Sequence, residues 1–101
     1  MTSAMPGGWT DWKDANEEVK ELCKKVKPIV EKQTGKQFAV FETLTFRTQI
    51  VAGKNYNIKV YAGNNMCAVL EFWQKLDGEI AVVRCVLLPL PSVEFYEKYT
   101  A

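Results

Sequence analysis

The sequence predicts an α+β domain in which one N-terminal helix packs across a four- to five-stranded antiparallel meander sheet. Apolar residues recur at helical spacing between residues 15 and 30, and with a period of two beyond residue 36. Short segments that favour turns separate the period-two runs, and such short connections favour antiparallel neighbours. We therefore expect the 101 residues to form a single domain spanning residues 1–101.

The first elements are a trunk and a helix. Residues 1–10 are small, polar or glycine-rich, which predicts a flexible N-terminal trunk. One apolar stripe at helical spacing follows, formed by Ala15, Val19, Leu22, Cys23, Val26, Ile29 and Val30. Asp14 and Glu17 have the spacing of a capping box, which predicts Asp14 as the N-cap. Pro28 should kink the helix, and Gly35 should end it.

A long strand is expected next. It should begin near residue 36 and run for about 14 residues, well beyond the usual strand length. Its inward side chains are Phe38, Val40, Leu44, Phe46 and Ile50. The outward ones are Thr43, Thr45, Arg47 and Gln49. A twisted strand of this length should curl around the helix.

Three further strands are expected at residues 55–61, 66–75 and 80–88. The turns between strands, at residues 51–54, 62–65 and 76–79, contain the Gly, Asn and Asp residues that tight turns favour. Inward side chains on the first two of these strands are Tyr56, Ile58, Val60, Met66, Ala68, Leu70 and Phe72. The last strand is apolar on both faces apart from Arg84, so it is either covered twice or has a partner. Residues 89–101 form a C-terminal tail.

Composition excludes several classes of activity. The 13 basic and 12 acidic residues nearly balance, so the chain lacks the excess of positive charge that binding to nucleic acid or an anionic membrane favours. The sequence contains no histidine, which excludes Ser-His-Asp and Cys-His catalysis and His-ligated metals. Paired carboxylates and a glycine-rich phosphate loop are also absent. We expect a protein that is not an enzyme, with no catalytic residue, no metal site and no cofactor.

The cysteines and the N-terminus indicate a reducing compartment. Cys23, Cys67 and Cys85 are too far apart for a CxxC pair or a zinc knuckle, and their number is odd. We expect all three to be structural thiols. No signal peptide or membrane-spanning run is recognisable, so we expect a soluble, cytoplasmic protein without membrane contact.

One motif stands out at the first turn between strands, where Gln49, Ile50, Val51, Ala52 and Gly53 read Q-x-V-x-G. Taken alone, these residues are the end of a strand followed by a turn glycine. Their wider setting adds Pro6-Gly7-Gly8, Val26-Lys27-Pro28, the strand segment 55–60, Ala62-Gly63-Asn64 and the Leu76-x-Gly78 turn, in that order. Over residues 5–86 this pattern resembles the stefins, the type 1 branch of the cystatin superfamily.

The resemblance implies a reversible, tight-binding, non-covalent inhibitor of papain-like cysteine proteases of the cathepsin type. Three segments at one end of the molecule would form a wedge that blocks the active-site cleft. The residues implied to bind the protease are Met5, Pro6, Gly7, Gly8, Gln49, Ile50, Val51, Ala52, Gly53, Leu76, Asp77 and Gly78.

The resemblance also implies a role for each segment. In the trunk, Met5 and Pro6 would reach the non-primed subsites, while Gly7 would let the chain pass close to the active-site wall. In the first hairpin, Gln49 would brace the loop by bonding its backbone, and Gly53 would set the turn.

Apolar contact with the cleft is implied for Ile50, Val51 and Ala52, and for Leu76 on the primed side. Two features depart from the family pattern. Stefins commonly have Leu-Pro-Gly in the second hairpin, where this chain has Asp77, and their polar tail is replaced by the apolar and aromatic segment 89–101.

Some alternatives remain open at this level. The protein could instead be a non-inhibitory interaction or self-associating module on the cystatin scaffold. A monomer is expected, although Val51 at the turn would permit a domain-swapped dimer. Trp9 and Trp12 form either a local apolar cluster or a binding platform, and Trp73 either borders the wedge or packs on a neighbour. Retention of the glycines, Gln49 and Val51 favours the inhibitor.

Overall fold

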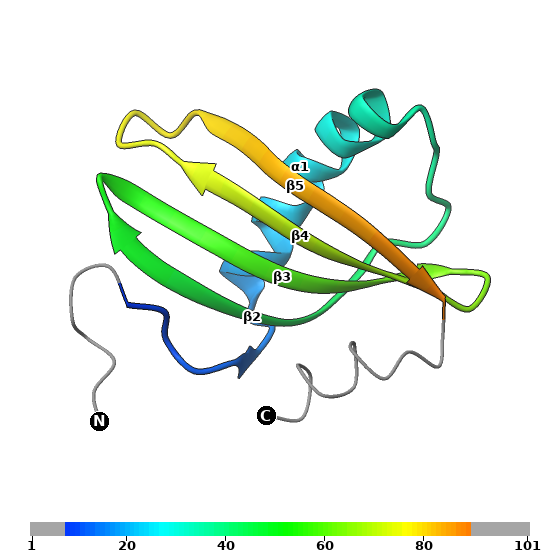
Figure 1. Cartoon of the computed structure of the whole chain (residues 1–101), viewed down its shortest axis with the longest axis horizontal. Coiled ribbons are helices and arrows are strands. Elements are labelled where there is room, and N and C mark those ends of the chain that lie inside the picture. Colours follow the sequence, from blue (N-terminus) through cyan, green and yellow to red (C-terminus); the bar gives the residue numbers. More distant parts are fainter. Residues whose placement is uncertain (1–7, 90–101) are drawn as a thin grey trace.

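The computed structural model describes residues 8–89 (Figure 1). One helix, α1 (Glu17–Thr34), lies across a five-stranded antiparallel sheet in which the strands follow one another in chain order. The strands are β1 (Lys13–Asp14), β2 (Glu42–Val51), β3 (Gly53–Gly63), β4 (Met66–Gln74) and β5 (Ile80–Pro89). The predicted α+β meander with a helix across it is confirmed.

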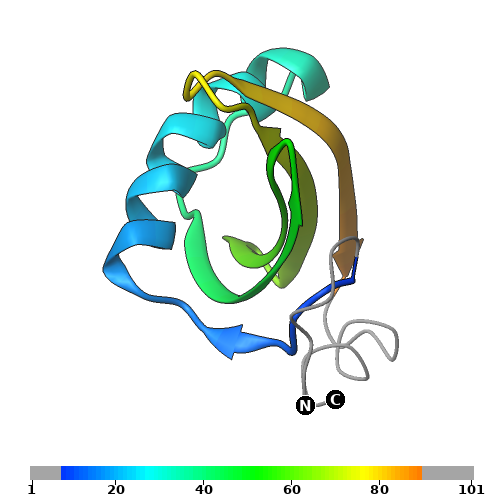
Figure 2. The same ribbon diagram turned by 90° about the vertical axis from the view of Figure 1, so that its left-hand side faces the viewer.

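The core lies between the helix and the concave face of the sheet. Figure 2 shows the sheet curving around α1, as the length of the strands predicts. The helix contributes Val19, Leu22, Cys23, Val26 and Val30, and the sheet contributes Phe46, Tyr56, Ile58, Val60, Ala68, Leu70 and Phe72. Fully burying one such aliphatic or aromatic side chain contributes about 1.5–3 kcal/mol, so this cluster holds the two layers together.

The start of the helix differs from the prediction. Asn16 is the N-cap, and its side-chain oxygen accepts a 2.9 Å hydrogen bond from the backbone N–H of Val19. Asp14, predicted as the N-cap, lies in β1, and the next residue, Ala15, still donates to the backbone of β2. Because pairing with β2 holds the chain extended through residue 15, the helix cannot begin earlier. Its end is as predicted, with Gly35 in the left-handed region at φ 74°.

The strand predicted from residue 36 begins later, at Glu42. Phe38 is buried but precedes the strand, and Val40 is 40% exposed rather than inward. A bulge between Thr43 and Thr45 shifts the register of β2. Thr43 therefore pairs with Val60, an inward-facing residue of β3, and is buried. Thr45 remains on the outer face but is buried as well. The predicted alternation is therefore wrong at Thr43, whereas from Thr45 onward the register is continuous and Phe46 faces the core as predicted.

A short edge strand precedes the helix and was not predicted. Lys13 and Asp14 pair with β2, and nearer the N-terminus Trp9 forms an isolated bridge with Gln49. Thr10 donates its backbone N–H to the Thr48 carbonyl at 2.8 Å. Two residues of the predicted flexible trunk, 9 and 10, are thus bonded to the sheet.

Strands β4 and β5 agree with the prediction to within one residue. Strand β3 begins at Gly53 rather than at residue 55, because Val51 and Gly53 pair directly, so the turn predicted at residues 51–54 is wrong and the tip is Ala52 alone. Gly63, Asn64 and Asn65 all have positive φ in the turn between β3 and β4. On β5 the inward side chains pack against the core, whereas Val83 is 61% exposed at a bulge. The tail from residue 90 onward lies outside the described residues. No helix in the described range is long and apolar enough to cross a membrane.

All three cysteines are free thiols. Cys23 and Cys67 are buried, and Cys85 is half-buried against the core. Burial raises the pKa of each of these three thiols. A raised pKa leaves less thiolate at neutral pH, which suits a structural role rather than a reactive one.

Candidate functional site

Two hairpin tips lie at the same end of the sheet, at the left of Figure 1. The first joins β2 to β3, where Val51 pairs with Gly53 across Ala52. The second is the loop of residues 75–79 between β4 and β5. One open groove is lined by both tips and by one residue of the helix: Glu18, Ile50, Val51, Gly53, Lys54, Tyr56, Gln74, Lys75, Leu76 and Gly78. The fold thus brings together the two hairpin segments that the sequence singled out.

The tips carry large apolar side chains that the core does not use. Ile50 is 53% exposed, Val51 40% and Leu76 84%. A single exposed apolar residue is ordinary, but these three share one edge of the molecule and flank one groove. They form an apolar edge that is available to a partner.

Gly53 is constrained twice. Its φ of 94° lies in the left-handed region, which side chains with a Cβ rarely adopt. A Cβ at this position would also collide with the backbone oxygen of Gln74 and lie 3.1 Å from both Lys75 Cα and Trp73 Nε1. Glycine is therefore required for the first tip to pack against the end of β4.

Trp73 fastens the first tip to the second hairpin. Its indole Nε1–H donates a 2.7 Å hydrogen bond to the carbonyl oxygen of Ala52. The ammonium of Lys75 lies 5.5 Å from the centre of its ring. Of the two alternatives left open by the sequence, the structure supports the one in which Trp73 borders the hairpin tips. The sequence contains no local signal for this bond, because its partners are far apart along the chain.

Gln49 braces the first hairpin across the two strands. Its side-chain oxygen accepts a 2.8 Å hydrogen bond from Nδ2 of Asn55, the residue opposite it on β3. The sequence predicted a bond to the loop backbone, whereas this bond joins two side chains. The bracing takes place two residues before Val51, at the base of the tip.

The second loop is closed by its own backbone and by Asp77. The carboxylate of Asp77 accepts a 2.9 Å bond from the N–H of Glu79, and Gly78 donates its N–H to the Lys75 carbonyl at 2.9 Å. Gly78 has φ 92°. The Asp that replaces the family's usual proline thus supplies a turn-closing acceptor, which leaves Leu76 as the side chain that projects outward.

The trunk is described only in part. Met5, Pro6 and Gly7 lie outside the described residues, while Gly8 is exposed beside Trp9. Because Trp9 pairs with Gln49, the chain reaches the base of the first tip at this point. Figure 1 shows this segment, in blue, following β2 toward its hairpin end.

The tryptophans near the N-terminus contact cations. The Arg47 guanidinium carbon lies 5.0 Å from the ring centre of Trp9 and 4.9 Å from that of Trp12. The ammonium of Lys59 lies 4.1 Å from the Trp12 ring. Sequence reasoning treated the two rings as either an apolar cluster or a platform, and missed that they are held by cations.

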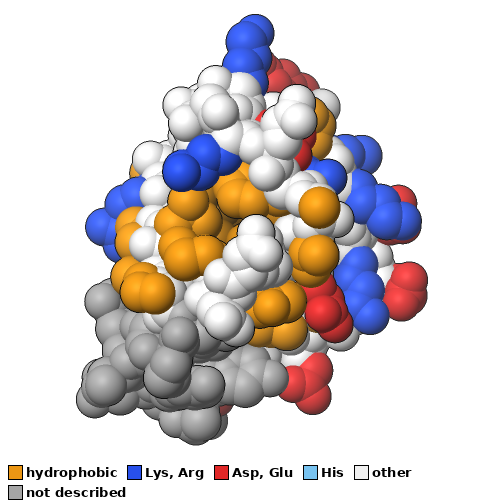
Figure 3. Space-filling model, turned by 90° about the vertical axis from the view of Figure 1, so that its right-hand side faces the viewer, with side chains coloured by type: hydrophobic (Ala, Val, Ile, Leu, Met, Phe, Trp, Pro, Cys, Tyr) orange, Lys and Arg blue, Asp and Glu red, His pale blue; other side chains and the backbone are white. Residues whose placement is uncertain are grey.

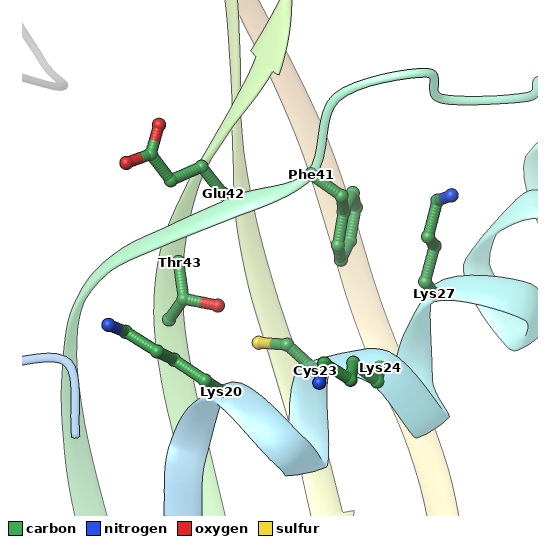
Figure 4. Close-up of a pocket in the computed structure, with 7 residues that line it drawn as sticks. All are labelled: Lys20, Cys23, Lys24, Lys27, Phe41, Glu42 and Thr43. Atoms are coloured by element: carbon green, nitrogen blue, oxygen red, sulfur yellow. The ribbon is translucent and has the colours of Figure 1, made fainter. Parts of the chain in front are cut away.

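A separate hollow lies between α1 and β2 (Figure 4), and its lining is Lys20, Cys23, Lys24, Lys27, Phe41, Glu42 and Thr43. Each lysine is paired with a glutamate of the same helix, at 2.9–3.8 Å. All three ammonium groups thus already have an anionic partner, and burial raises the pKa of the Cys23 thiol, which disfavours a reactive thiolate in the hollow.

The far end of the molecule differs from the edge with the hairpin tips. Figure 3 views that far end and shows hydrophobic side chains gathered there. A shallow pocket in this region is lined by residues including Phe38, Ala62, Met66 and Leu87. None of the predicted site residues in the described range lines it. Within that range no three His, Cys, Asp or Glu side chains are placed to hold a metal.

A single helix across a five-stranded meander, with a Q-x-V-x-G hairpin and a second loop at one edge, defines a cystatin-type protein. The chain belongs to the cystatin family, whose domain matches residues 7–83. It is 40% identical over 75 residues to cystatin-A of Homo sapiens, an alignment that covers 74% of this chain and 76% of that protein.

Other relatives agree. Leukocyte cysteine proteinase inhibitor 1 of Sus scrofa is 40% identical over 75 residues, 74% of this chain and 73% of that protein. Cystatin-B of Oplegnathus fasciatus is 40% identical over 74 residues, 73% of this chain and 74% of that protein. The resemblance to stefin-type cystatins is thereby confirmed, and the name of the Sus scrofa protein is that of a cysteine proteinase inhibitor.

Proposed function

We propose that this protein is a reversible, tight-binding, non-covalent inhibitor of papain-like cysteine proteases of the cathepsin type. The observation that carries the proposal is the apolar edge formed by Ile50, Val51 and Leu76 on two adjacent hairpin tips. Together with the trunk residues Met5, Pro6, Gly7 and Gly8, this edge is the wedge that would enter the active-site cleft.

The shape of the tip accounts for why the inhibitor would survive in the cleft. Cleavage needs an extended strand whose carbonyl carbon is aligned with the attacking thiolate. At the first tip the backbone instead reverses within Ala52, with Val51 and Gly53 paired across it. The Ala52 carbonyl oxygen is engaged by Trp73. A hairpin held in this way fills the cleft without offering a peptide bond in the geometry for attack.

Tight binding follows from rigidity. The Gln49–Asn55 bond, the Trp73–Ala52 bond and the closed loop at Asp77 hold the tips before docking. A pre-ordered apolar surface loses little conformational entropy when it docks, so a small contact area can give high affinity. We further propose that the protein acts as a cytoplasmic monomer.

The test is a titration of active papain with the purified protein, read by release of a fluorescent peptide. We expect stoichiometric, reversible loss of activity. Full papain activity at micromolar excess of folded monomer would contradict the proposal and favour a non-inhibitory module on the same scaffold.

Two glycine variants sharpen this test. Gly53→Ala should weaken inhibition by more than about tenfold, because both the positive φ and the contact with Gln74 oppose a side chain. Gly35→Ala is the matched control, since it has φ 74° but lies at the end of α1 with open space around it. It should inhibit papain like the parent.

A further inference from the structure

The N-terminal segment is attached to the sheet by few backbone bonds. Between Trp9 and Asp14 it has one isolated bridge, the Thr10 bond to β2 and the two-residue strand β1. An edge segment this short is not stable through backbone pairing alone and belongs to the part of a structure that opens first. Side-chain contacts must therefore contribute to holding it in place.

One side-chain contact is the 3.0 Å hydrogen bond that Oγ1 of Thr10 accepts from the Thr48 N–H. The aromatic contacts converge on Arg47, and we call Arg47, Trp9 and Trp12 the cation clamp. Both rings lie within the range of a cation–π contact, at 5.0 and 4.9 Å from the guanidinium carbon. A guanidinium suits this role because it is planar, delocalised and weakly hydrated, and so stacks on aromatic faces.

The clamp is anchored in the middle of the sheet. Nη2 and Nε of Arg47 donate to Oδ1 of Asn57 at 3.2 and 3.4 Å, which ties the cation to β3. Trp12 is also contacted by the buried Lys59, whose ammonium lies 4.1 Å from the ring centre. The clamp thus links the N-terminal segment, residues 9–14, to strands β2 and β3.

Its position determines where the trunk leaves the sheet. Gly8 adjoins Trp9, and Trp9 pairs with Gln49 in the Q-x-V-x-G hairpin. We propose that Arg47, acting through Trp9 and Trp12, is a positioning residue that holds residues 8–14 beside β2 and so fixes the point at the base of the first hairpin from which the chain would reach the protease. The proposal rests on the inhibitory function proposed above. A chain that is already held at this point loses less conformational entropy on docking, and release of residues 8–14 would appear mainly as faster dissociation.

The first measurement is the dissociation rate of the papain complex. Arg47→Ala should raise this rate by about tenfold, the effect of losing two cation–π contacts. Arg47→Lys should fall between Arg47→Ala and the parent, because a lysine keeps the charge but not the planar stack. Arg84→Ala is the matched control, since Arg84 is an exposed arginine on β5, at the opposite edge of the sheet. It should dissociate like the parent.

A second measurement tests whether the effect passes through the rings. In a Trp9→Ala, Trp12→Ala background, Arg47→Ala should change the dissociation rate by less than about twofold, because coupled residues are not additive. Amide hydrogen exchange at Thr10, which bonds to Thr48, should be faster in Arg47→Ala than in the parent and unchanged in Arg84→Ala.

Three results would overturn the inference. The first is a dissociation rate of Arg47→Ala equal to that of the parent, and the second is an equal increase of that rate in Arg84→Ala. The third is an increase by Arg47→Ala in the Trp9→Ala, Trp12→Ala background as large as its increase in the parent. Failure of the inhibitory function is distinguishable from these. If the parent does not inhibit papain, Thr10 exchange still reports whether Arg47 holds the segment. Parental exchange in Arg47→Ala would then overturn the positioning role as well.

Discussion

Trp73 joins the two hairpins of the candidate site through a single hydrogen-bond donor. Its indole bonds the Ala52 carbonyl, and its ring lies beside the position where a Cβ on Gly53 would intrude. The two residues are complementary, because the absence of a side chain at Gly53 lets the end of β4 approach the first tip. A small residue and a large one therefore define the shape of the same edge.

Trp73→Phe isolates the bond to Ala52, because phenylalanine keeps an aromatic ring but has no N–H. We expect an unfolding free energy lower by about 1 kcal/mol, the usual net contribution of one hydrogen bond. Papain inhibition should weaken by up to about fivefold, since 1.4 kcal/mol corresponds to a factor of ten in affinity and this bond contributes about 1 kcal/mol. Tyr61→Phe, which removes a hydroxyl far from the tips, should inhibit like the parent. Equal inhibition by the two variants would contradict the bracing role of Trp73.

Elements are delimited by pairing with their neighbours as much as by their own composition. The helix begins only where the chain leaves β2, so Asn16 rather than Asp14 is the N-cap and accepts the Val19 N–H. The bulge after Thr43 likewise changes which face of the sheet Thr43 occupies, although no glycine or proline in this segment predicts it. Both the start of the helix and the facing of Thr43 are thus determined by pairing with a neighbouring strand.

The position of the helix cap can be measured directly with urea unfolding. Asn16→Ala removes the acceptor of the Val19 N–H and should lower the unfolding free energy by about 0.5–2 kcal/mol. Asp14→Ala is the comparison, because this exposed residue lies before the helix, and it should change stability by less than about 0.5 kcal/mol. The reverse order of the two effects would restore Asp14 as the cap.

In the whole molecule the core and the proposed binding edge occupy different places. The core lies between α1 and the concave face of the sheet, whereas the apolar tips lie at one end with their side chains exposed. No described core residue has to be exposed for the edge to bind a partner. Burial in the core therefore stabilises the fold, while Ile50, Val51 and Leu76 at the tips stay exposed to water.

Two leucines on the same hairpin test this separation. Leu70 is fully buried, so Leu70→Ala leaves a cavity in the core and should lower the unfolding free energy by about 2–5 kcal/mol. Wherever it remains folded, it should inhibit papain like the parent. Leu76→Ala should leave the unfolding free energy within about 0.5 kcal/mol of the parent but weaken inhibition. Unfolding curves and papain titrations on both variants provide the measurement, and matching losses in both assays would refute the separation.

Much of this organisation is encoded locally. The stripe from Val19 to Val30 predicts a helix because its period is a property of neighbouring residues, and the turn residues at 62–65 and 76–79 act through their own φ preferences. The motif from Gln49 to Gly53 likewise marked the hairpin that lies at the candidate site. The class of fold, the core face and the two tips could all be predicted from such patterns.

Other features depend on partners distant in the sequence. Strand β1 and the shift of the cap to Asn16 arise from pairing between segments on either side of the helix. The bulge in β2 arises from the register in which β2 pairs with β3. The bond from Trp73 to Ala52 and the clamp on Arg47 each join a strand to a segment outside the strands that is distant in the sequence. Local periodicity reports which face of an element is apolar but not which neighbour meets it, because that depends on the register in which the strands pair.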